Sequence, residues 1–261
     1  MDVPTKSQID RLGTRLRTTD RVHDSDLEML QDVRRAHDEV LAEVTESLAV
    51  LSFQGDRLHP TSRLKTIGTI VDKLKRESVR LSQMDDIAGT RVVFDGGLAD
   101  QDGITRVIRR AFPVHDVKDR RERPSHGYRA VHVVVVHRDL RVEIQIRTVL
   151  QDVWAQLMEK LADSWGRRIR YGEPPLAPET PAFRAGAREL TRQEVVNTVL
   201  VLADLVGRVE RLQADQFGVG PRLVAELRSH LPQELQERSR EVEALYGDLE
   251  NTLRSLMGVD G

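Results

Sequence analysis

The chain has 261 residues, of which 39% are hydrophobic and 31% charged, so it can bury a sizeable core in one domain with helical extensions. A formal net charge of −2 gives no global basic field to recruit DNA, and the lack of cysteine excludes disulfides, thiolate chemistry and cysteine-ligated zinc. The polar N-terminus is unlike a signal peptide and no apolar run could span a membrane, so we expect a cytoplasmic protein without a membrane partner.

Residues 1–58 are expected to form a helical N-terminal segment. Apolar side chains recur at steps of three and four over residues 27–51, which is the period of one helix face and marks that face as core. Ser25 and Asp26 stand where an N-cap belongs, and Gly55 then interrupts the helical pattern.

Residues 59–172 alternate helices and strands. Thr69 and Asp72 are spaced as in a capping box. The predicted elements, in order, are a helix near 69–83, a strand at 89–94, a helix around 104–111, strands at 113–117, 128–137 and 141–147, and a helix from Val149. This order predicts an α/β or α+β sheet domain.

Residues 173–261 are expected to form a C-terminal helical extension. A proline-rich link is followed by two predicted helices, at residues 186–214 and 221–257. The second carries a narrow apolar stripe from Val242 to Leu256, which could be a dimer seam or could pack on its own domain. Trp154 and Trp165, earlier in the chain, are expected to be core anchors.

The two strands at 128–137 and 141–147 alternate in a way that sorts their side chains onto two faces. A hairpin loop centred on Asp139 and Leu140 would place Val136 opposite Glu143 and His132 opposite Arg147. One face then gathers polar and aromatic side chains, namely Tyr128, His132, Glu143, Gln145 and Arg147. A solvated hairpin face would explain the charges alone, but this combination favours a nucleotide-phosphate site, because tyrosine can stack a base and arginine can clamp a phosphate.

Other carboxylates and basic residues within 59–172 also suit a nucleotide-phosphate site. Asp86 opens a strand, and together with Glu143 it could hold Mg²⁺ against a triphosphate, although an isolated pair of aspartates is more often a helix end and turn. The basic residues that could bind the phosphates are Arg63, Lys65, Lys73 and Arg76. A solvated basic face explains them equally well when they are taken alone.

Five motifs occur in order: Arg63-x-Lys65-x-x-x-Thr69-Ile70-x-x-Lys73-Leu74-x-Arg76, Asp86-Ile87-Ala88-Gly89-x-Arg91, Gly127-Tyr128-Arg129-x-Val131-His132, Val142-Glu143-Ile144-Gln145-Ile146-Arg147-Thr148 and Trp154-Ala155. This series resembles the synthetase domain of RelA/SpoT-type alarmone synthetases and is most similar to the small, single-domain members. The resemblance covers about residues 60–160, and five ordered motifs make it specific.

The resemblance implies a nucleotidyltransferase-like mixed sheet flanked by helices. It also implies Mg²⁺-dependent transfer of pyrophosphate from ATP to the 3′-hydroxyl of GDP or GTP, which gives ppGpp or pppGpp and AMP. In this family the residues that hold the ATP phosphates match Arg63, Lys65, Lys73 and Arg76, and the Mg²⁺ and catalytic carboxylates match Asp86 and Glu143. The residue that stacks on guanine matches Tyr128. The residues that line the acceptor side match His132, Gln145 and Arg147, with Lys118 as a further basic position. We expect Glu143 to accept the hydroxyl proton.

Three departures from the family pattern fall mostly on the acceptor side. Residues 124–128 read Pro-Ser-His-Gly-Tyr where relatives often read Pro-Lys-x-Asn-Gly-Tyr. Met158 and Glu159 replace a Glu-His pair, and Thr69 replaces a serine. Guanine nucleotide as acceptor is therefore less firmly indicated than ATP as donor. The paired histidines of the family's hydrolase site do not occur near the N-terminus, so we expect no alarmone hydrolysis.

Two alternatives stay open. A toxin-like relative would pyrophosphorylate adenine nucleotides or the 3′ end of tRNA, and a degenerate domain would bind nucleotide or a protein partner without catalysis. Both carboxylates and all four phosphate-binding positions are present, which favours catalysis. Small synthetases form oligomers, so the resemblance also implies homo-oligomerisation.

Overall fold

In a computed structural model, residues 4–19, 22–185 and 188–217 are described, and the second predicted C-terminal helix with its apolar stripe lies outside them. The described residues form two compact units: the first takes those of 1–92, 104–118 and 132–146, and the second takes those of 93–103, 119–131 and 147–217. The three-part division expected from the sequence stays a prediction.

The secondary structure alternates as the middle of the sequence predicts. In order, the elements are α1 (Lys6–Thr18), α2 (Asp24–Ala49), β1 (Ser52–Phe53), β2 (Asp56–Arg57), β3 (Pro60–Leu64), α3 (Ile67–Arg76), η1 (Leu81–Gln83), β4 (Ala88–Phe94), α4 (Leu98–Ala111), β5 (Val114–Asp119), β6 (Val131–His137), β7 (Leu140–Thr148), α5 (Val149–Trp165), η2 (Arg167–Tyr171), β8 (Pro181–Ala185), β9 (Arg188–Thr191) and α6 (Arg192–Phe217). The predicted α/β class, a mixed sheet flanked by helices, is confirmed.

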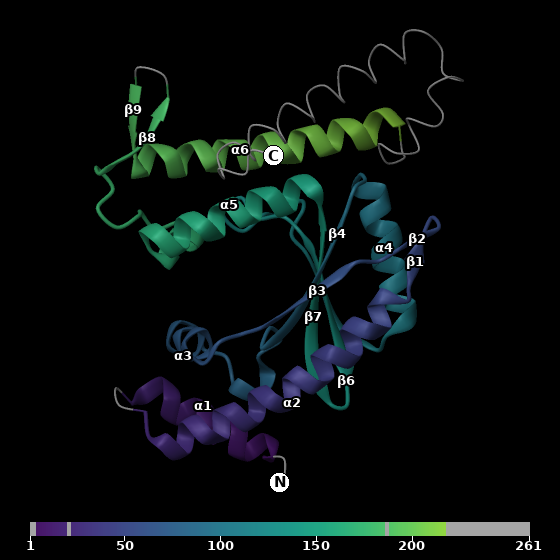
Figure 1. Cartoon of the computed structure of the whole chain (residues 1–261), viewed down its shortest axis with the longest axis vertical. Coiled ribbons are helices and arrows are strands. Elements are labelled where there is room, and N and C mark those ends of the chain that lie inside the picture. The colour runs from purple at the N-terminus through teal and green to yellow at the C-terminus, as the bar shows by residue number, and fades with distance from the viewer. Residues whose placement is uncertain (1–3, 20–21, 186–187, 218–261) are drawn as a thin grey trace. The chain divides into compact units, whose positions relative to one another are not determined.

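The main sheet has five strands in the order β3-β4-β7-β6-β5. Figure 1 labels β3, β4, β6 and β7 of this sheet. Four of the five strands lie where the sequence predicts them, whereas β3 was missed. It is a short edge strand that begins at Pro60 and leaves its side chains largely exposed, so it lacks the apolar alternation by which strands are recognised. β3 runs antiparallel to β4, with Arg63 opposite Gly89.

The β6–β7 hairpin turns one residue earlier than predicted. Arg138 and Asp139 alone separate the strands and both have left-handed backbones, with φ of 46° and 62°, as a two-residue type I′ turn requires. This turn places Val134 opposite Glu143 and His132 opposite Gln145, so the predicted pairs were wrong by two residues. A shift of two preserves the face of every side chain.

The first unit packs α1, α2, α3 and η1 around one apolar core that includes Leu12, Leu30 and Ile70. The predicted N-cap of α2 was wrong: the cap is His23 and α2 begins at Asp24. Asp26 lies inside the first turn, where Arg15 of α1 binds its carboxylate at 2.7–2.9 Å. The predicted capping box at Thr69 was also wrong.

The cap of α3 is Thr66, whose hydroxyl accepts a hydrogen bond from the Thr69 amide. The helix therefore starts at Ile67, directly after the loop that carries Lys65. Within this unit α2 packs along β3.

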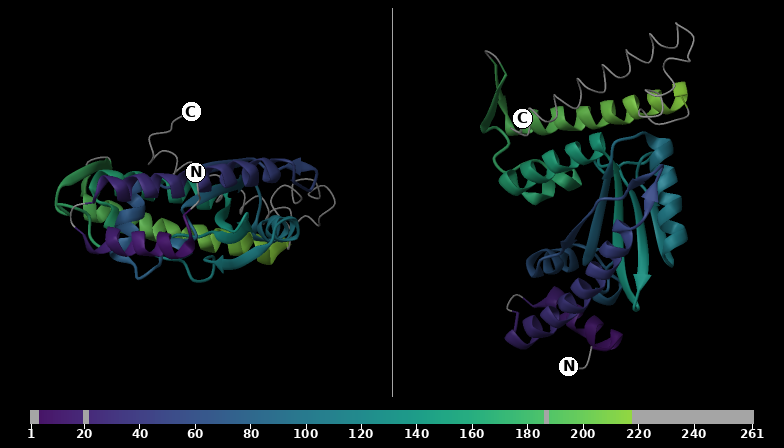
Figure 2. Two further views of the ribbon diagram at one scale, coloured as in Figure 1. Left: turned by 90° about the horizontal axis from the view of Figure 1, so that it is seen from below. Right: turned by 45° about the vertical axis from the view of Figure 1, so that its right-hand side comes forward.

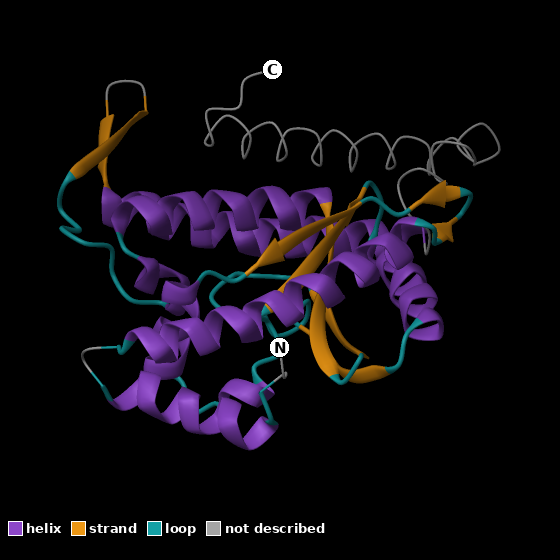
Figure 3. Ribbon diagram, turned by 60° about the horizontal axis from the view of Figure 1, so that its bottom comes forward, coloured by secondary structure: helices purple, strands orange, loops and turns teal. Residues whose placement is uncertain are grey.

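The second unit is built on α5 and α6, which lie side by side (Figure 2). Trp154 is buried between them, and Trp165 packs on the same core while staying partly exposed, so both expected anchors contact the core. β8 and β9 pair antiparallel (Figure 3), and β9 ends at Thr191, whereas the sequence predicted a helix from 186. That boundary was wrong because a capping box formed by Thr191 and Glu194 sets the start of α6 at Arg192.

Within the described residues, every helix is too short or too polar to cross a membrane.

Replacing Leu12 with alanine tests the core that supports α3. Leu12 is fully buried in α1, so we expect Leu12→Ala to lower the free energy of unfolding by about 2–5 kcal/mol. The matched control is Val50→Ala at a position that is 69% exposed, where a change within about 0.5 kcal/mol is expected. Urea denaturation of both variants measures this, and equal effects would contradict the assignment of Leu12 to the core.

Candidate active site

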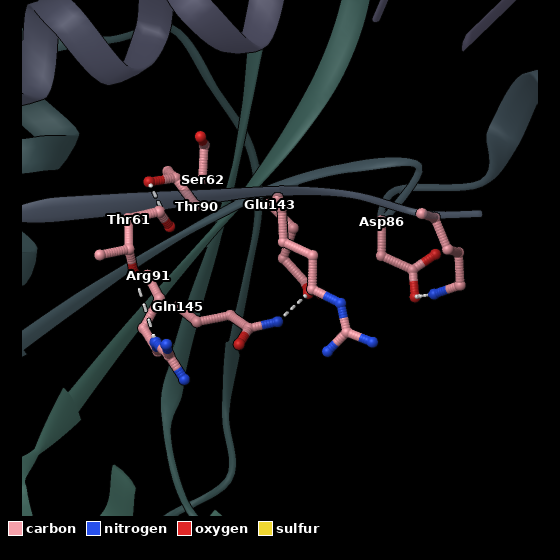
Figure 4. Close-up of a pocket in the computed structure, with 10 residues that line it drawn as sticks. Thr61, Ser62, Asp86, Thr90, Arg91, Glu143 and Gln145 are labelled. Carbon is pink, nitrogen blue, oxygen red and sulfur yellow. Dashed lines mark hydrogen bonds and ion pairs between the residues drawn. The ribbon is translucent and has the colours of Figure 1, made fainter. Parts of the chain in front are cut away.

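A pocket of about 310 Å³ opens on the first unit along β3, β4 and β7 (Figure 4). Its lining residues are Thr61, Ser62, Arg63, Lys65, Asp86, Gly89, Thr90, Arg91, Glu143 and Gln145. Five of these ten were predicted from the sequence as site residues: both carboxylates, two of the cations and Gln145. The pocket therefore gathers residues that are up to 84 positions apart in the chain, from Thr61 to Gln145.

Asp86 is held between two lysines. Its Oδ2 accepts hydrogen bonds from Lys65 Nζ at 2.7 Å and Lys73 Nζ at 2.9 Å. Burial raises the pKa of this carboxyl, but the charges and hydrogen bonds of the two lysines outweigh burial and hold the pKa below its usual range. Its Oδ1 is buried and has no hydrogen-bond partner among the described residues, so Asp86 is an ionised group with one acceptor position unused.

Local structure explains why Lys65 and Lys73 converge. The backbone amide of Lys65 donates to the Ile87 carbonyl, and the carbonyl of Lys65 accepts a hydrogen bond from Arg34 of α2. These two bonds fix the segment between β3 and α3. Lys73 lies two turns into α3, on the helix that Thr66 caps.

The other two predicted cations differ in position. Arg63 lines the pocket from β3. Arg76 bonds Glu77 at 2.9 Å and is 40% exposed, outside the pocket lining. Of the four predicted phosphate-binding positions, Arg63 and Lys65 line the pocket, Lys73 reaches it through Asp86, and Arg76 does not line it.

Glu143 is a buried anion at the centre of β7. Its Oε1 lies 2.9 Å from His132 Nδ1 and its Oε2 accepts from Gln145 Nε2 at 2.8 Å, the second contact being visible in Figure 4. These contacts confirm that His132, Glu143 and Gln145 share one face of the hairpin. Because an ionised carboxylate only accepts hydrogen bonds, Nδ1 of His132 carries the proton.

The partners of Glu143 set its charge. Burial alone would raise its pKa, but the hydrogen bond and charge of His132, the bond from Gln145 and the charge of Lys73 lower the pKa to about 2. Glu143 therefore stays ionised at neutral pH and is a weak base there.

Lys118 lies in a separate ion cluster of the first unit. Its Nζ bonds Asp85 at 2.7 Å, and Arg141 bonds the same carboxylate at 2.8 Å. Burial lowers the pKa of Lys118, but the bond and charge of Asp85 raise it overall. Asp85 is thus the partner that fixes Lys118, and Arg141, which the sequence did not single out, completes the cluster.

In the second unit, Tyr128 and Arg147 form a pair. Arg147 donates to the Tyr128 hydroxyl at 3.0 Å, and its guanidinium lies 5.1 Å from the centre of the ring. Arg147 is only 4% exposed and also binds Asp152 of α5 at 2.9 Å. Tyr128 precedes β6 in a tight turn closed by a bridge to Ser125, so the strand predicted from residue 128 begins only at Val131.

Four polar residues that line the pocket were not predicted from the sequence as site residues: Thr61, Ser62, Thr90 and Arg91. Thr61 and Ser62 belong to β3, so they were lost with that strand. Arg91 stands in the motif that carries Asp86, and its Nε lies 3.4 Å from Thr61 Oγ1 across the β3–β4 pair. Arg91 could have been found from its place two residues after Gly89 on a strand of the pocket, because residues two apart in a strand lie on the same face.

The pocket residues fit one kind of metal site. The described residues contain no group of three or more histidines and carboxylates that could enclose a cation. Two carboxylates line the pocket, however, and Asp86 offers a buried oxygen without a partner. Such a site suits Mg²⁺, which is usually held by one or two carboxylates together with the phosphates of a nucleotide.

Comparisons with known proteins identify the same part of the chain. Residues 62–164 match the model of the region found in RelA / SpoT proteins. An uncharacterized protein of Mycobacterium tuberculosis is 41% identical over 145 residues, which cover 53% of this chain and 52% of that protein. The GTP pyrophosphokinase YjbM of Bacillus subtilis is 33% identical over 116 residues, which cover 39% of this chain and 54% of that protein.

The chain thus spans about half the length of the curated relatives it matches. The crystal structure of the small alarmone synthetase 1 from Bacillus subtilis superposes with a TM-score of 0.52 at 22% identity, covering 75% of this chain and 97% of that chain. The two proteins therefore share a fold.

The low pKa of Glu143 predicts how stability depends on pH. Because folding lowers this pKa from its ordinary 4.5 to about 2, the ionised carboxylate stabilises the fold above pH 4.5, and the contribution disappears as the pH falls toward 2. The difference in unfolding free energy between the natural protein and Glu143→Gln should therefore shrink over this interval. Metal-free urea denaturation across it, with the exposed Glu46→Gln as control, measures the effect; a difference that does not change with pH would contradict it.

Proposed function

We propose that residues 62–164, which carry the region found in RelA / SpoT proteins, transfer pyrophosphate from ATP to the 3′-hydroxyl of GDP or GTP. The products are ppGpp or pppGpp and AMP. The observation that carries the proposal is the pocket of the first unit, where Asp86 and Glu143 are both held ionised beside Arg63 and Lys65. Two curated relatives that this chain matches are named GTP pyrophosphokinases, which supports the same reaction.

The donor nucleotide would bind in this pocket through its phosphates. Arg63 and Lys65 line the pocket, and Lys73 reaches Asp86, so three cations are available to an anionic triphosphate. Mg²⁺, when bound, would neutralise phosphate charge between Asp86 and Glu143. Positioning and charge neutralisation supply most of the catalysis in phosphoryl transfer, and these residues provide both.

The chemical step joins two nucleotides at phosphorus. The 3′-oxygen of the acceptor attacks the β-phosphorus of ATP, the bond from that phosphorus to the α–β bridging oxygen breaks, and AMP leaves with the bridging oxygen. The hydroxyl proton must go to a base.

The sequence assigned that proton to Glu143, but both oxygens of this carboxylate are already engaged, Oε1 with His132 Nδ1 and Oε2 with Gln145 Nε2. We assign the proton to His132, since Glu143 holds the proton of Nδ1 and, in the neutral ring, Nε2 is then the basic nitrogen. Glu143 orients the ring and contributes negative charge for the metal.

Tyr128 and Arg147 are proposed to bind the acceptor. The Arg147 guanidinium fixes both the ring and the hydroxyl of Tyr128, so the tyrosine is held in one orientation and can stack a base. Gln145 and Lys118 remain proposed acceptor residues. Homo-oligomerisation, a cytoplasmic location and the absence of hydrolase activity stay predictions.

An acceptor screen tests the proposed function. Purified protein with Mg²⁺ and ATP labelled in the β-phosphate is offered GDP, GTP, AMP, ATP and tRNA separately. Label on GDP or GTP is expected. Label on an adenine nucleotide or on tRNA would overturn the acceptor and favour the toxin-like alternative, whereas nucleotide binding without any transfer would favour the non-catalytic one.

Substitutions of Asp86, Glu143 and the Glu143 partner His132 test the assigned roles. His132→Asn should lower kcat by about 10²–10⁴, because general base catalysis contributes on that order. Glu143→Gln and Asp86→Asn should lower kcat by about a hundredfold or more and raise the Mg²⁺ concentration needed for half-maximal activity.

The matched control is His137→Asn at the other end of β6, where the ring binds Glu43 at 2.7 Å. It should leave kcat unchanged. An unchanged kcat in His132→Asn would return the proton to Glu143.

A further inference from the structure

The turn that carries Tyr128 packs against α6, a helix outside the matched residues 62–164. Gly127 has a φ of +87°, and a Cβ there would lie 2.7 Å from the Trp154 ring and 2.8 Å from the Ala203 Cβ. The turn therefore fits closely between α5 and α6, with no room for a side chain at the residue before Tyr128.

Arg129, on the other side of Tyr128, is buried against the same helix. It is 6% exposed, and its Nη1 donates to the Ala203 carbonyl at 2.5 Å. The same nitrogen donates to the Gly127 carbonyl at 3.3 Å, and Nη2 lies 3.5 Å from the Asp204 carboxylate. A single guanidinium thus ties both the turn and α6 together, in a place where losing the contact would leave a buried charge.

Gly207 makes room for that guanidinium. A Cβ at Gly207 would lie 2.6 Å from Arg129 Nε and 2.8 Å from its Cζ and Nη2. Glycine inside a helix is destabilising relative to alanine, so its place in the fifth turn of α6 has a packing reason rather than a helical one.

A second contact fixes the end of β7 to α6. Glu210 is buried, and it accepts from Thr148 Oγ1 at 2.5 Å and from Gln151 Nε2 at 3.0 Å. Thr148 directly follows Arg147 and is the N-cap of α5. Glu210 therefore holds the backbone position from which Arg147 reaches Tyr128.

These contacts converge on one pair of side chains. Arg129 and Gly127 locate the turn of Tyr128, Glu210 locates the residue after Arg147, and Arg147 binds Tyr128 itself. We infer that α6 positions the Tyr128–Arg147 pair, with Arg129 seated at Ala203 and Gly207 as the positioning residue, and that this contact sets the affinity for the acceptor nucleotide. The inference rests on the proposed function for the identity of that nucleotide.

Gly207→Ala tests the inference without weakening the helix itself, because alanine favours a helix more than glycine does. Its Cβ should displace the Arg129 guanidinium from α6. We expect the KM for GDP or GTP to rise about tenfold or more while the KM for ATP changes by less than about twofold. Arg129→Met should have the same effect, and Arg208→Met, at an exposed arginine of α6, should change neither constant.

A double-mutant cycle separates positioning from general destabilisation. If Gly207→Ala acts by displacing Arg129, then adding it to Arg129→Met should raise the acceptor KM no further. Acceptor KM values that are unchanged in both single variants would overturn the inference. So would a parallel change in both KM values and kcat.

Hydrogen exchange tests the same contact in the absence of catalysis. The amides of residues 125–131 should exchange faster in Gly207→Ala and in Arg129→Met than in the natural protein or in Arg208→Met. If the natural protein transfers label to none of the acceptors, the proposed function fails, and the exchange rates still decide whether α6 holds the turn. Equal exchange in all four proteins would overturn the inference by itself.

Discussion

Burial of the Glu143 carboxylate in β7 is the constraint on which the rest of the pocket depends. An ionised carboxylate in a sheet is costly unless several donors and charges compensate for it. His132, Gln145 and the more distant Lys73 do so, and together they bring the pKa down to about 2 despite burial. These polar residues of β6, β7 and α3 are therefore required by that charge as much as by any ligand. The same compensation makes Glu143 a fixed anion, which suits holding a cation and orienting an imidazole better than accepting a proton.

His132 can compensate the Glu143 charge only if the β6–β7 hairpin turn places both side chains on the same face of the sheet. Because Arg138 and Asp139 form a two-residue turn, His132 falls on the face of Glu143 and Gln145. A loop longer by one residue would turn His132 to the opposite face and leave the carboxylate without its main partner. Two residues that tolerate left-handed backbones at the tip of the hairpin therefore determine the electrostatics several residues away.

Much of the site could be predicted from the sequence because it depends on local patterns. Alternation in β7 gave the faces of Glu143 and Gln145, and ordered motifs gave Asp86, Arg63 and Lys65 before any distance was known. The predictions that failed did so for different reasons. Asp26 looks like a cap until Arg15 is placed beside it, and β3 has no apolar alternation because it is an exposed edge strand, so Thr61 and Ser62 were lost with it. The start of α6 was a missed local signal, since Thr191 and Glu194 have capping-box spacing.

The contacts by which α6 holds the Tyr128–Arg147 pair could not be predicted from the sequence, for a further reason. Arg129 stands in a recognisable motif, but its partners Ala203 and Gly207 lie more than 70 residues away, in a helix without a motif. An alanine or a glycine in a sequence does not indicate that an arginine side chain packs against it. Here the Arg129 guanidinium bonds to the backbone carbonyl of Ala203 and fills the space left by the missing side chain of Gly207. Since a small change in such a helix can move the turn without touching Tyr128, acceptor preference could diverge between proteins whose motifs are the same. Under the proposed function, the departures from the family pattern at residues 124–126 lie in this turn, and α6 is the place to look for the compensating changes.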